Sequence, residues 1–382
     1  MDNLVNVNLY RSNINWHDSM EQTFEYYEVD PGTWKDIKRL TNITSSSVSR
    51  DAEVETLGSA TINATETVGE CYVRIYLVVS QNGITEKHSL GTFLVQTPSS
   101  SFNGKVRDVV MDAYTPLLEL KENPPPIGYY IPEKSNVLEH ASVITKEHVR
   151  APVVEAYGTD ELYKDFVSNT NDTWLTFVRD LLANAKHELA LDELSRILFS
   201  PKQELASMQP VWTYDDSNSS ILYPDITMDH DLFEIPNVVE VVFSNSYGCH
   251  YARVVNDDSN SPTSTISRGR EILHRVTDPG LGDNPTNSQV QEYAENLLEQ
   301  LSSAVYTVTY SHGYCPVRLG DCVRLNYSGS GITDVKAKVI SQTIDCRPGC
   351  KVTETAVFTA KLFEINRGFG SGSAQHSGVT RG

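Results

Sequence analysis

The stretch from Cys71 to Pro98, CYVRIYLVVSQNGITEKHSLGTFLVQTP, decides the fold more than any other part of the chain. Its first half alternates strictly, with apolar side chains at the odd positions Cys71, Val73, Ile75, Leu77 and Val79. Period-two patterning predicts a β-strand with one dry face. Asn82-Gly83 supplies the positive-φ residues of a tight turn, and we expect the return strand to end at Pro98, which cannot donate to a ladder. The stretch predicts a β-hairpin with Cys71 in the core.

Strand patterns also dominate the rest of residues 1–120. The candidate strands and turns are Glu25–Val29 with the turn Asp30-Pro31-Gly32, then Ile43–Arg50, Ala60–Ala64 and the apolar segment Val109–Leu120. Asn123-Pro124-Pro125-Pro126 follows, and a triple proline is typical of a domain boundary. Residues 1–120 are therefore predicted to form a first β domain.

The middle of the chain, residues 121–235, predicts a small α/β domain. Ser135-Asn136 begins a helix that runs to about His148, with an apolar face at Val137, Leu138, Ala141 and Ile144. We expect Asn171 or Asp172 to cap a second helix, whose apolar stripe is Trp174, Leu175, Val178, Leu181, Leu182 and Ala185. Glu188–Glu193 and Arg196–Phe199 predict a small hairpin closed by Pro201.

Residues 236–366 return to strand patterns and include one helix. The predicted elements are strands at Asn237–Phe243, Tyr247–Asn256, Val305–Tyr310, Cys322–Tyr327, Val335–Ser341 and Thr353–Ile365, and a helix opened by Asp283-Asn284-Pro285 with its stripe from Val290 to Leu301. Residues 367–382 are rich in glycine and serine and predict a flexible tail. Two β-rich domains of similar size around an α/β domain favour a duplicated barrel, although no residue-by-residue repeat is visible.

The charge of the chain excludes a nucleic-acid reader. Fifty acidic residues against 31 basic ones give a net charge of −19, and the basic residues form no stripe. The N-terminal sequence carries no apolar run of signal-peptide length, and no stretch approaches the roughly 20 apolar residues of a membrane span. We expect a chain made in the cytosol that does not itself bind membranes.

Ten short segments carry a resemblance to a known family. In chain order they are Trp34–Asp36, Val48–Arg50, Glu70–Tyr76, Leu90–Val95, Ala113–Leu118, Gly128–Pro132, Arg179–Leu182, Pro236–Val239, Arg268–Glu271 and Leu319–Val323. Each pattern alone is weak, but their order and spacing over about residues 20–365 resemble the tail hub, or baseplate hub, proteins of tailed bacteriophages and of related contractile injection machines.

The resemblance implies a fold and a role. The fold is α+β and mainly β: two tube-type β-barrel domains, residues 1–120 and 236–366, flank the small α/β domain 121–235. A homotrimer of such chains forms a pseudo-hexameric ring that joins the tail tube, or a distal tail protein, to a spike or tail-tip protein, and DNA passes through the lumen. The implied protein is structural and not an enzyme, is synthesised in the host cytoplasm, and is located in the virion at the tail tip or baseplate.

Cys315, Cys322, Cys346 and Cys350 are the candidate metal ligands. The spacing C-x6-C…C-x3-C brings four thiolates together if the two segments are neighbours, and some tail-tip proteins related to hubs hold a cysteine-ligated iron–sulfur cluster. Zinc ribbons have tight CxxC pairs, which are missing here. An iron–sulfur cluster or zinc, a disulfide such as Cys346–Cys350, and free thiols all remain open; we favour free thiols and therefore no cofactor.

Three other groups of residues invite a functional interpretation. His312 and Cys315 raise the possibility of a nucleophile pair, but nearness in sequence is not the geometry that such a pair needs. Asp225, Asp229, His230 and Asp231 form an acidic cluster that lacks the EF-hand pattern, and we interpret it as a solvated loop. The polar segment Asn256–Thr265 is either a partner contact or a disordered loop.

A different function stays open beside the hub. A carbohydrate-binding module on the virion periphery would grip host surface glycans, and an exposed trio of Tyr129, Tyr130 and Trp212 in one groove would favour it. A hub with a DNA channel instead predicts an acidic or neutral lumen, because dense lysine and arginine would hold each passing phosphate.

Overall fold

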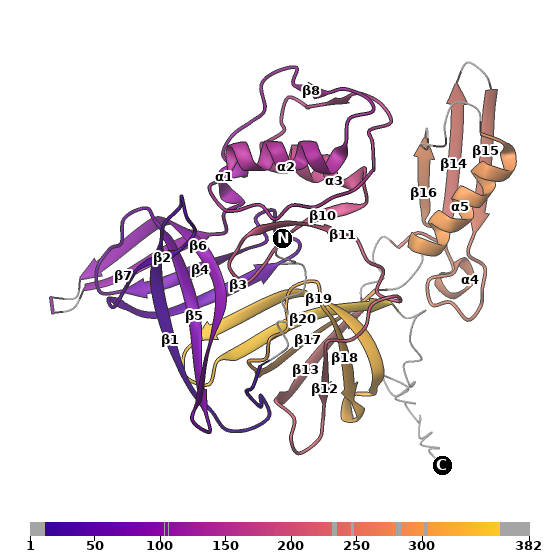
Figure 1. Cartoon of the computed structure of the whole chain (residues 1–382). Helices are drawn as coiled ribbons and strands as arrows, with labels where there is room; N and C mark the ends of the chain where they lie inside the picture. Colours follow the sequence, from indigo (N-terminus) through magenta and orange to yellow (C-terminus); the bar gives the residue numbers. More distant parts are fainter. Residues whose placement is uncertain are drawn as a thin grey trace, which may run out of the picture. The chain divides into compact units, whose positions relative to one another are not determined.

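The computed structural model describes residues 12–359, except residues 103, 106, 231–234, 246–247, 278, 280, 282–284 and 302–304. The predicted tail, the acidic residue Asp231 and the proposed cap Asp283-Asn284 lie outside the described residues. The described chain is mainly β with few helices, which confirms the predicted fold class, and Figure 1 traces its elements.

Strands occur along the whole described chain and alternate with helices from α1 (Leu118–Lys121) to α5 (Asn287–Leu301). The first strands are β1 (Glu21–Val29), β2 (Asp36–Arg39), β3 (Ile43–Asp51), β4 (Gly58–Ala64), β5 (Tyr72–Gln81), β6 (Ile84–Phe102) and β7 (Arg107–Tyr114). The middle strands are β8 (Tyr130–Ile131), β9 (Phe166–Val167), β10 (His187–Leu191), β11 (Ile197–Pro201), β12 (Trp212–Asp215) and β13 (Leu222–His230). The last are β14 (Val238–Asn245), β15 (Gly248–Val255), β16 (Leu273–Thr277), β17 (Val305–Gly313), β18 (Cys322–Tyr327), β19 (Ile332–Cys346) and β20 (Lys351–Thr359).

The helices are short, and the chain divides into two compact units. The helices are α1 (Leu118–Lys121), α2 (Val137–His148), α3 (Trp174–Ala183), α4 (Thr265–Arg268), α5 (Asn287–Leu301) and the 3₁₀ turn η1 (Ser328–Ser330). Unit 1 holds the residues up to Asp225 together with Thr309–Arg324 and Lys338–Ala356. Unit 2 holds Ile226–Val308, Leu325–Ala337 and the residues from Val357 on.

The predicted hairpin is β5–β6. Asn82 (φ 51°) and Gly83 (φ 81°) form its turn, and the odd positions of β5 are fully buried, as the alternation predicts. The opposite face is less exposed than predicted, because Tyr72 packs into the core of unit 1 and Arg74 is held by hydrogen bonds. Cys71 lies just before β5 and is only half-buried, so its assignment to the core was wrong.

The return strand does not end at Pro98, as the sequence predicted, but continues to Phe102. Leu94 is the last residue of β6 that pairs with β5, and from Leu94 on the strand pairs with β7, where Pro98 lies opposite Met111. A proline is tolerated there because only one side of the strand carries a ladder. Gly91 (φ 143°) sits at a bulge in the β5–β6 pairing, and a Cβ there would lie 2.6 Å from the Phe93 ring. This position therefore requires glycine.

One large antiparallel network connects strands that are far apart in sequence. Its order is β13-β17-β20-β19-β3-β4-β7-β6-β5-β1-β2, and β18 pairs with both β12 and β19. The early and late strands are connected where β19 pairs antiparallel with β3, with Ile344 opposite Val48 and Gln342 opposite Arg50. Whether these strands close into two barrels stays a prediction, as do the domain bounds 1–120, 121–235 and 236–366.

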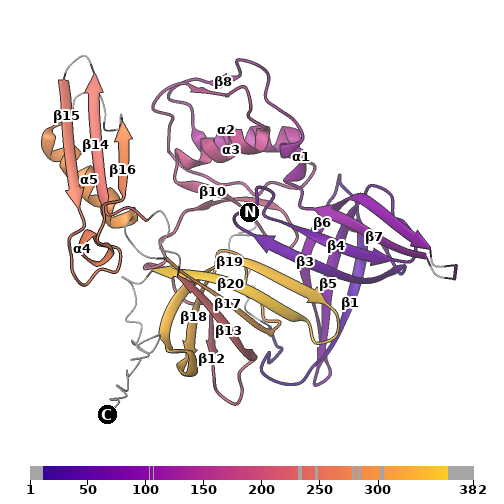
Figure 2. The same cartoon turned by 180° about the vertical axis from the view of Figure 1, so that it is seen from behind.

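The α/β part of unit 1 packs α2 and α3 side by side over a shared core, as Figures 1 and 2 show. Asn136 caps α2 by accepting from the Glu139 amide, as predicted, and the predicted apolar faces of both helices are buried. The cap of α3 is Thr173, in a capping box with Thr176, and not Asn171 or Asp172. The core also includes Trp34 and Tyr72, so the helices and the β1–β7 strands share one hydrophobic interior.

Unit 2 contains a small sheet of its own. β14 pairs antiparallel with β15 and parallel with β16, and the apolar stripe of α5 packs on this sheet through Val290, Ala294 and Leu298. A capping box between Thr286 and Gln289 precedes α5. The sequence grouped β14 and β15 with the strands after Val305, but the structure places β17–β20 in the large network with β12 and β13.

The polar segment after β15 is an ordered loop. The side-chain amide of Asn256 donates to the hydroxyls of Ser261 (3.1 Å) and Thr263 (3.4 Å). The backbone carbonyl of Asn256 accepts from the backbone amide of Thr265 at 2.9 Å. Thr263 and Ser264 are buried, and Ser264 caps α4. The alternative of a disordered loop was therefore wrong.

Trp174 offers a test of the α3 core. Its ring stacks on His148 at 4.4 Å between centroids and meets Tyr129 edge-on at 5.0 Å, with 5% of the residue exposed. Trp174→Ala should lower the free energy of unfolding by about 3 kcal/mol or more, because it leaves a cavity under α3.

Chemical denaturation of the full chain measures this change. Val143→Ala on the exposed side of α2, where the side chain is 48% exposed, is the matched control and should change stability by less than about 0.5 kcal/mol. Equal effects of the two substitutions would contradict the packing described for α3.

Candidate functional site

The turn between β10 and β11 is a rigid polar tip, and we call residues Asp192–Arg196 the hairpin tip. One oxygen of the Asp192 carboxylate accepts from the amides of Leu194 (3.0 Å) and Arg196 (2.8 Å), and the other accepts from the Arg196 guanidinium at 2.5 Å. Ser195 has a positive φ of 56° and is buried. The carboxylate of Asp192 therefore fixes the turn that presents Ser195 and the carbonyl of Leu194.

The hairpin tip docks on β6 and on Trp34 through four hydrogen bonds. The Thr92 amide donates to the Ser195 hydroxyl at 2.8 Å, and the Thr92 hydroxyl donates to the Leu194 carbonyl at 3.0 Å. The Ser89 hydroxyl donates to the Glu193 carbonyl at 2.7 Å, and the Trp34 indole donates to Leu194 at 2.8 Å. These bonds join the α/β part of unit 1 to its β-sheet.

Arg74 extends this network under the sheet. Its Nε donates to the Thr92 hydroxyl at 2.8 Å, Nη1 to Asp36 at 2.8 Å, and Nη2 to the Trp34 carbonyl at 3.2 Å. The side chain is only 4% exposed. A buried guanidinium costs little when its donors are used, so Arg74 supports the hydroxyl that meets the hairpin tip.

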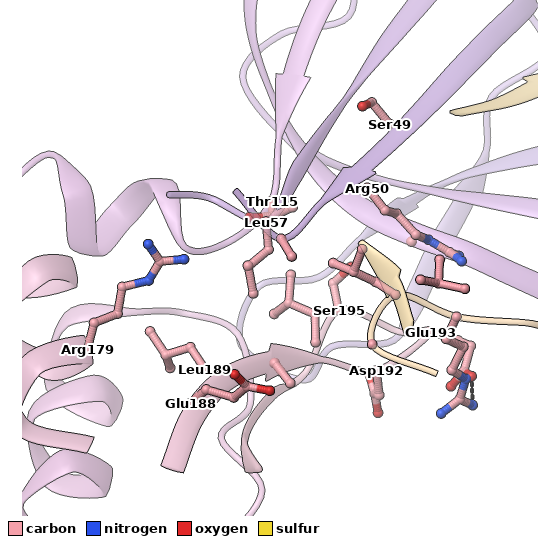
Figure 3. Close-up of a pocket in the computed structure, with 18 of the residues that line it drawn as sticks. Ser49, Arg50, Leu57, Thr115, Arg179, Glu188, Leu189, Asp192, Glu193 and Ser195 are labelled. Atoms are coloured by element: carbon pink, nitrogen blue, oxygen red, sulfur yellow. Dashed lines mark ion pairs between the residues drawn. The ribbon is translucent and has the colours of Figure 1, made fainter. Parts of the chain in front are cut away.

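A cavity of about 420 Å³ lies beside the hairpin tip. Figure 3 shows Arg50, Asp192 and Glu193 on one side and Arg179, Glu188 and Leu189 on the other. Ion pairs balance part of this charge: Glu193 contacts Arg318, Asp192 contacts Arg196, and Lys338 lies 3.9 Å from Glu188. Paired charges of this kind are typical of a contact between packed parts of one unit.

A second polar cluster is fully buried around Glu354. Tyr310 donates to one carboxylate oxygen, and the Gln342 amide donates to the other at 2.7 Å. His312 Nε2 lies 3.5 Å from the carboxylate and 3.1 Å from the Tyr214 hydroxyl. Gln342 in turn accepts from Arg50 at 3.2 Å, which links this cluster to the wall of the cavity.

The cluster shifts the pKa values of its members. Burial opposes the charged imidazole of His312, but Cys315 and Glu354 outweigh that effect and raise its pKa to about 10. Burial, with Cys315 and Glu354 adding to it, raises the pKa of the Tyr214 hydroxyl well above its ordinary value. At neutral pH the imidazole of His312 is therefore protonated inside the sheet.

Strand alternation in the sequence carries the signal of this cluster, which the predicted sites did not include. His312 follows Val308 and Tyr310 at intervals of two, and Glu354 follows Val352 and precedes Ala356 in the same way; all six are buried. An ionisable residue in phase with apolar neighbours of a strand is placed on the inner face. Two such residues of opposite charge in nearby strands predict a buried pair.

The four candidate cysteines are buried, and burial together with Cys350, Cys315 and Cys346 raises the pKa of the Tyr314 hydroxyl. All four are thiols: Cys315 lies 3.2 Å from the Tyr214 hydroxyl, Cys322 and Cys346 face backbone carbonyls, and Cys350 follows the β19–β20 turn. Burial raises the pKa of Cys346 to about 12 and that of Cys350 further. Among the described residues, no group of three or more histidine, cysteine or carboxylate side chains is arranged to hold a metal ion. The absence of a cofactor stays a prediction.

His312 and Cys315 lie near each other but not as a catalytic pair. The Cys315 sulfur is 4.0 Å from His312 Nδ1, and that nitrogen is 2.7 Å from the Gly313 carbonyl, to which it donates. Both side chains are at most 2% exposed, which leaves no path for a substrate. A nucleophile needs a base that accepts its proton, and Nδ1 is already a donor.

The remaining sequence candidates separate in the structure. Tyr129 packs inward against Phe177 at 5.4 Å, Tyr130 is exposed, and Trp212 stacks on His17 at 5.3 Å. Figures 1 and 2 place β8 and β12 far apart in unit 1, so the three aromatics form no common groove. Asp225 and Asp229 are exposed residues of strand β13, not of the loop that the sequence predicted.

The comparisons with known proteins concern the fold. No protein-family model and no curated protein matches the chain. The tail protein from Neisseria meningitidis MC58 superposes with a TM-score of 0.65 and 10% identity, covering 89% of this chain and 97% of that one. The 43 kDa tail protein of prophage MuSo2 from Shewanella oneidensis superposes with a TM-score of 0.60 and 10% identity, covering 90% and 100%.

These likenesses show that the chain shares the fold of these two tail proteins over about nine-tenths of its length. They confirm, at the level of fold, the resemblance carried by the ten sequence segments. No helix of the described residues is long and apolar enough to cross a membrane.

The buried His312–Glu354 pair predicts how stability depends on pH. A raised folded-state pKa contributes stability that is complete below the ordinary value of 6.5 and is lost as the pH rises toward about 10. The free energy of unfolding should fall between pH 7 and pH 10 by about 1 kcal/mol per pH unit from this pair.

Urea denaturation across this pH range, on the wild type and on His312→Asn, separates the pair from other titrating groups. The variant should be less stable at pH 7 and should show a shallower decline. A decline of equal slope in both proteins would contradict the charged state assigned to His312.

Proposed function

We propose that the protein is a structural component of a phage-type tail, the hub at the tail tip or baseplate. The observation that carries the proposal is the extent of the fold likeness: both tail proteins are matched over 97% or more of their own length. A match of this extent includes every part of those chains and not one common domain. Fold alone does not fix function, so the role rests on this likeness together with the architecture described above.

The proposed role is mechanical and not enzymatic. The cavity of unit 1 is lined by paired charges, and the buried His312–Glu354 pair is closed to solvent. Both features stabilise a rigid scaffold. A hub needs such rigidity because it transmits load between neighbouring tail proteins.

The proposed assembly is a homotrimer with partners at both faces. Three chains with two β modules each would present six modules to the tail tube or a distal tail protein, and three-fold symmetry to a spike or tail-tip protein. Closed rotational symmetry of this kind is the usual way in which identical chains assemble. The continuous strand network supports the proposal because it ties early and late strands of one chain together through β3 and β19.

The oligomeric state is the first test. Native mass spectrometry of the purified full chain should give three times the mass of the 382-residue chain, either alone or when mixed with tail fractions. A chain that stays a monomer in solution and inside isolated tails would contradict the hub.

The net charge of the chain provides a second test, which concerns the proposed DNA channel. Three copies of a chain with net charge −19 carry −57, which favours an acidic or neutral lumen for DNA transit. The trimer should not retard duplex DNA in a gel shift at low salt, because phosphate–cation contacts dominate such binding. Retardation that weakens steeply with added salt would indicate a basic lumen and contradict this part of the proposal.

A further inference from the structure

Two segments of unit 1, residues 127–136 and 157–168, form a ridge of exposed apolar side chains, which we call the tyrosine ridge. The segments run antiparallel: Tyr130 pairs with Val167, the Lys134 amide donates to Leu162 at 2.8 Å, and the Leu162 amide donates to Ser135 at 2.9 Å. The exposed residues are Ile127 (99%), Tyr157 (86%), Tyr163 (82%), Tyr130 (57%) and Val167 (55%).

The tyrosine ridge is held firmly from below. Ile131 and Phe166 alternate with the exposed pair Tyr130 and Val167 and point into the core, where Phe166 lies 4.9 Å from Phe177. The Asn136 side chain donates to the Gly158 carbonyl at 2.7 Å. The Asp165 carboxylate accepts from the Glu133 amide at 2.9 Å. The exposure of the aromatics is therefore a property of a fixed surface and not of a loose loop.

Such a surface is typical of a protein interface. Scattered exposed apolar residues are normal, but these five large ones are concentrated on two segments that hydrogen bonds hold side by side. Tyrosine is enriched at interface centres because it buries a large area with little loss of rotamer freedom and keeps a polar hydroxyl. Three of the five residues are tyrosines.

The charged residues on the tyrosine ridge indicate which kind of partner the ridge would bind. Glu133, Asp160, Glu161 and Asp165 are exposed on the two segments, against Lys134 and Lys164. Two copies of this surface would face each other with like charges, in a chain that already carries −19. A basic partner would instead gain attraction at the rim while the tyrosines lose water at the centre.

We propose that the tyrosine ridge docks onto a basic surface of a different tail protein. The identity of the partner as a tail protein rests on the proposed function; the surface and its charge preference rest on the ridge itself. The ridge would then hold the neighbour through aromatic contacts, and its carboxylates would orient that neighbour.

Cross-linking mass spectrometry of isolated tails locates the partner, because Lys134 and Lys164 lie on the ridge and react with amine cross-linkers. The expected result is cross-links from these lysines to a lysine- and arginine-rich surface of another chain. Cross-links from the ridge lysines only to further copies of this chain, or only to an acidic surface, would overturn the proposal. The proposal would also be overturned if the ridge lysines formed no cross-links while other lysines of the chain reacted. A chain that is missing from the tails altogether would instead contradict the proposed function.

Variants measure the contribution of the ridge. Tyr157→Ser with Tyr163→Ser, and separately Asp160→Arg with Glu161→Arg, should each reduce cross-links from Lys134 and Lys164 to the partner at least tenfold, normalised to the amount of chain in the tails. Arginine reverses the charge without adding a reactive amine. Phe102→Ser, which removes an aromatic that is 68% exposed in β6, is the control and should leave them unchanged. All three variants should melt like the wild type, because the altered side chains are exposed. Undiminished cross-links in either ridge variant would overturn the proposal.

Discussion

The hydrogen bonds between the hairpin tip and β6 are the constraint on which the rest of unit 1 depends. They are made by buried groups, so each contributes only about 0.5–1.5 kcal/mol when formed but costs about 1–3 kcal/mol when one partner is missing. Thr92 is fully buried and has both its amide and its hydroxyl bonded to the tip. This asymmetry makes any other placement of the α/β part unfavourable, and it sets where α2 and α3 meet the sheet.

Two arginines reinforce this arrangement from the side of the sheet. Arg74 supports Thr92 from below, and Arg50 connects the cavity wall to Gln342 and so to Glu354. Fully bonded polar networks of this kind contribute more to a unique structure than to net stability. A scaffold that must keep its shape under load gains from such uniqueness. The proposed hub role and the chemistry of the interior therefore agree.

Local patterns in the sequence predicted the elements that depend on local physics. The β5–β6 turn at Asn82-Gly83, the cap of α2 at Asn136 and the apolar stripe of α3 are each encoded within a few residues. The strand β12 was missed because it has only four residues, and β13 because it contains Pro224 and polar residues. The partners of both strands also lie far away in the sequence. Such pairings are decided by the whole fold and not by propensity.

The same distinction between local patterns and long-range contacts explains which site residues could be predicted from the sequence. The hairpin tip acts through Ser195 and the backbone carbonyls of Glu193 and Leu194, which no motif marks. The four cysteines formed a motif by spacing, but among the described residues they belong to no group arranged to hold a metal ion. The resemblance to tail hub proteins predicted the fold from order and spacing of weak segments. The fold likeness to two tail proteins at 10% identity supports it where sequence comparison finds no match.

Native-state hydrogen exchange on Ser195→Ala tests the central claim, that the hairpin tip makes the helices and the sheet of unit 1 one cooperative structure. The substitution removes the acceptor of the Thr92 amide. The account predicts that amides of α3 and of β6 lose the same protection, about 1–3 kcal/mol, while Ser200→Ala on β11 leaves both unchanged. Loss confined to the Thr92 amide, with α3 protected as in the wild type, would contradict it.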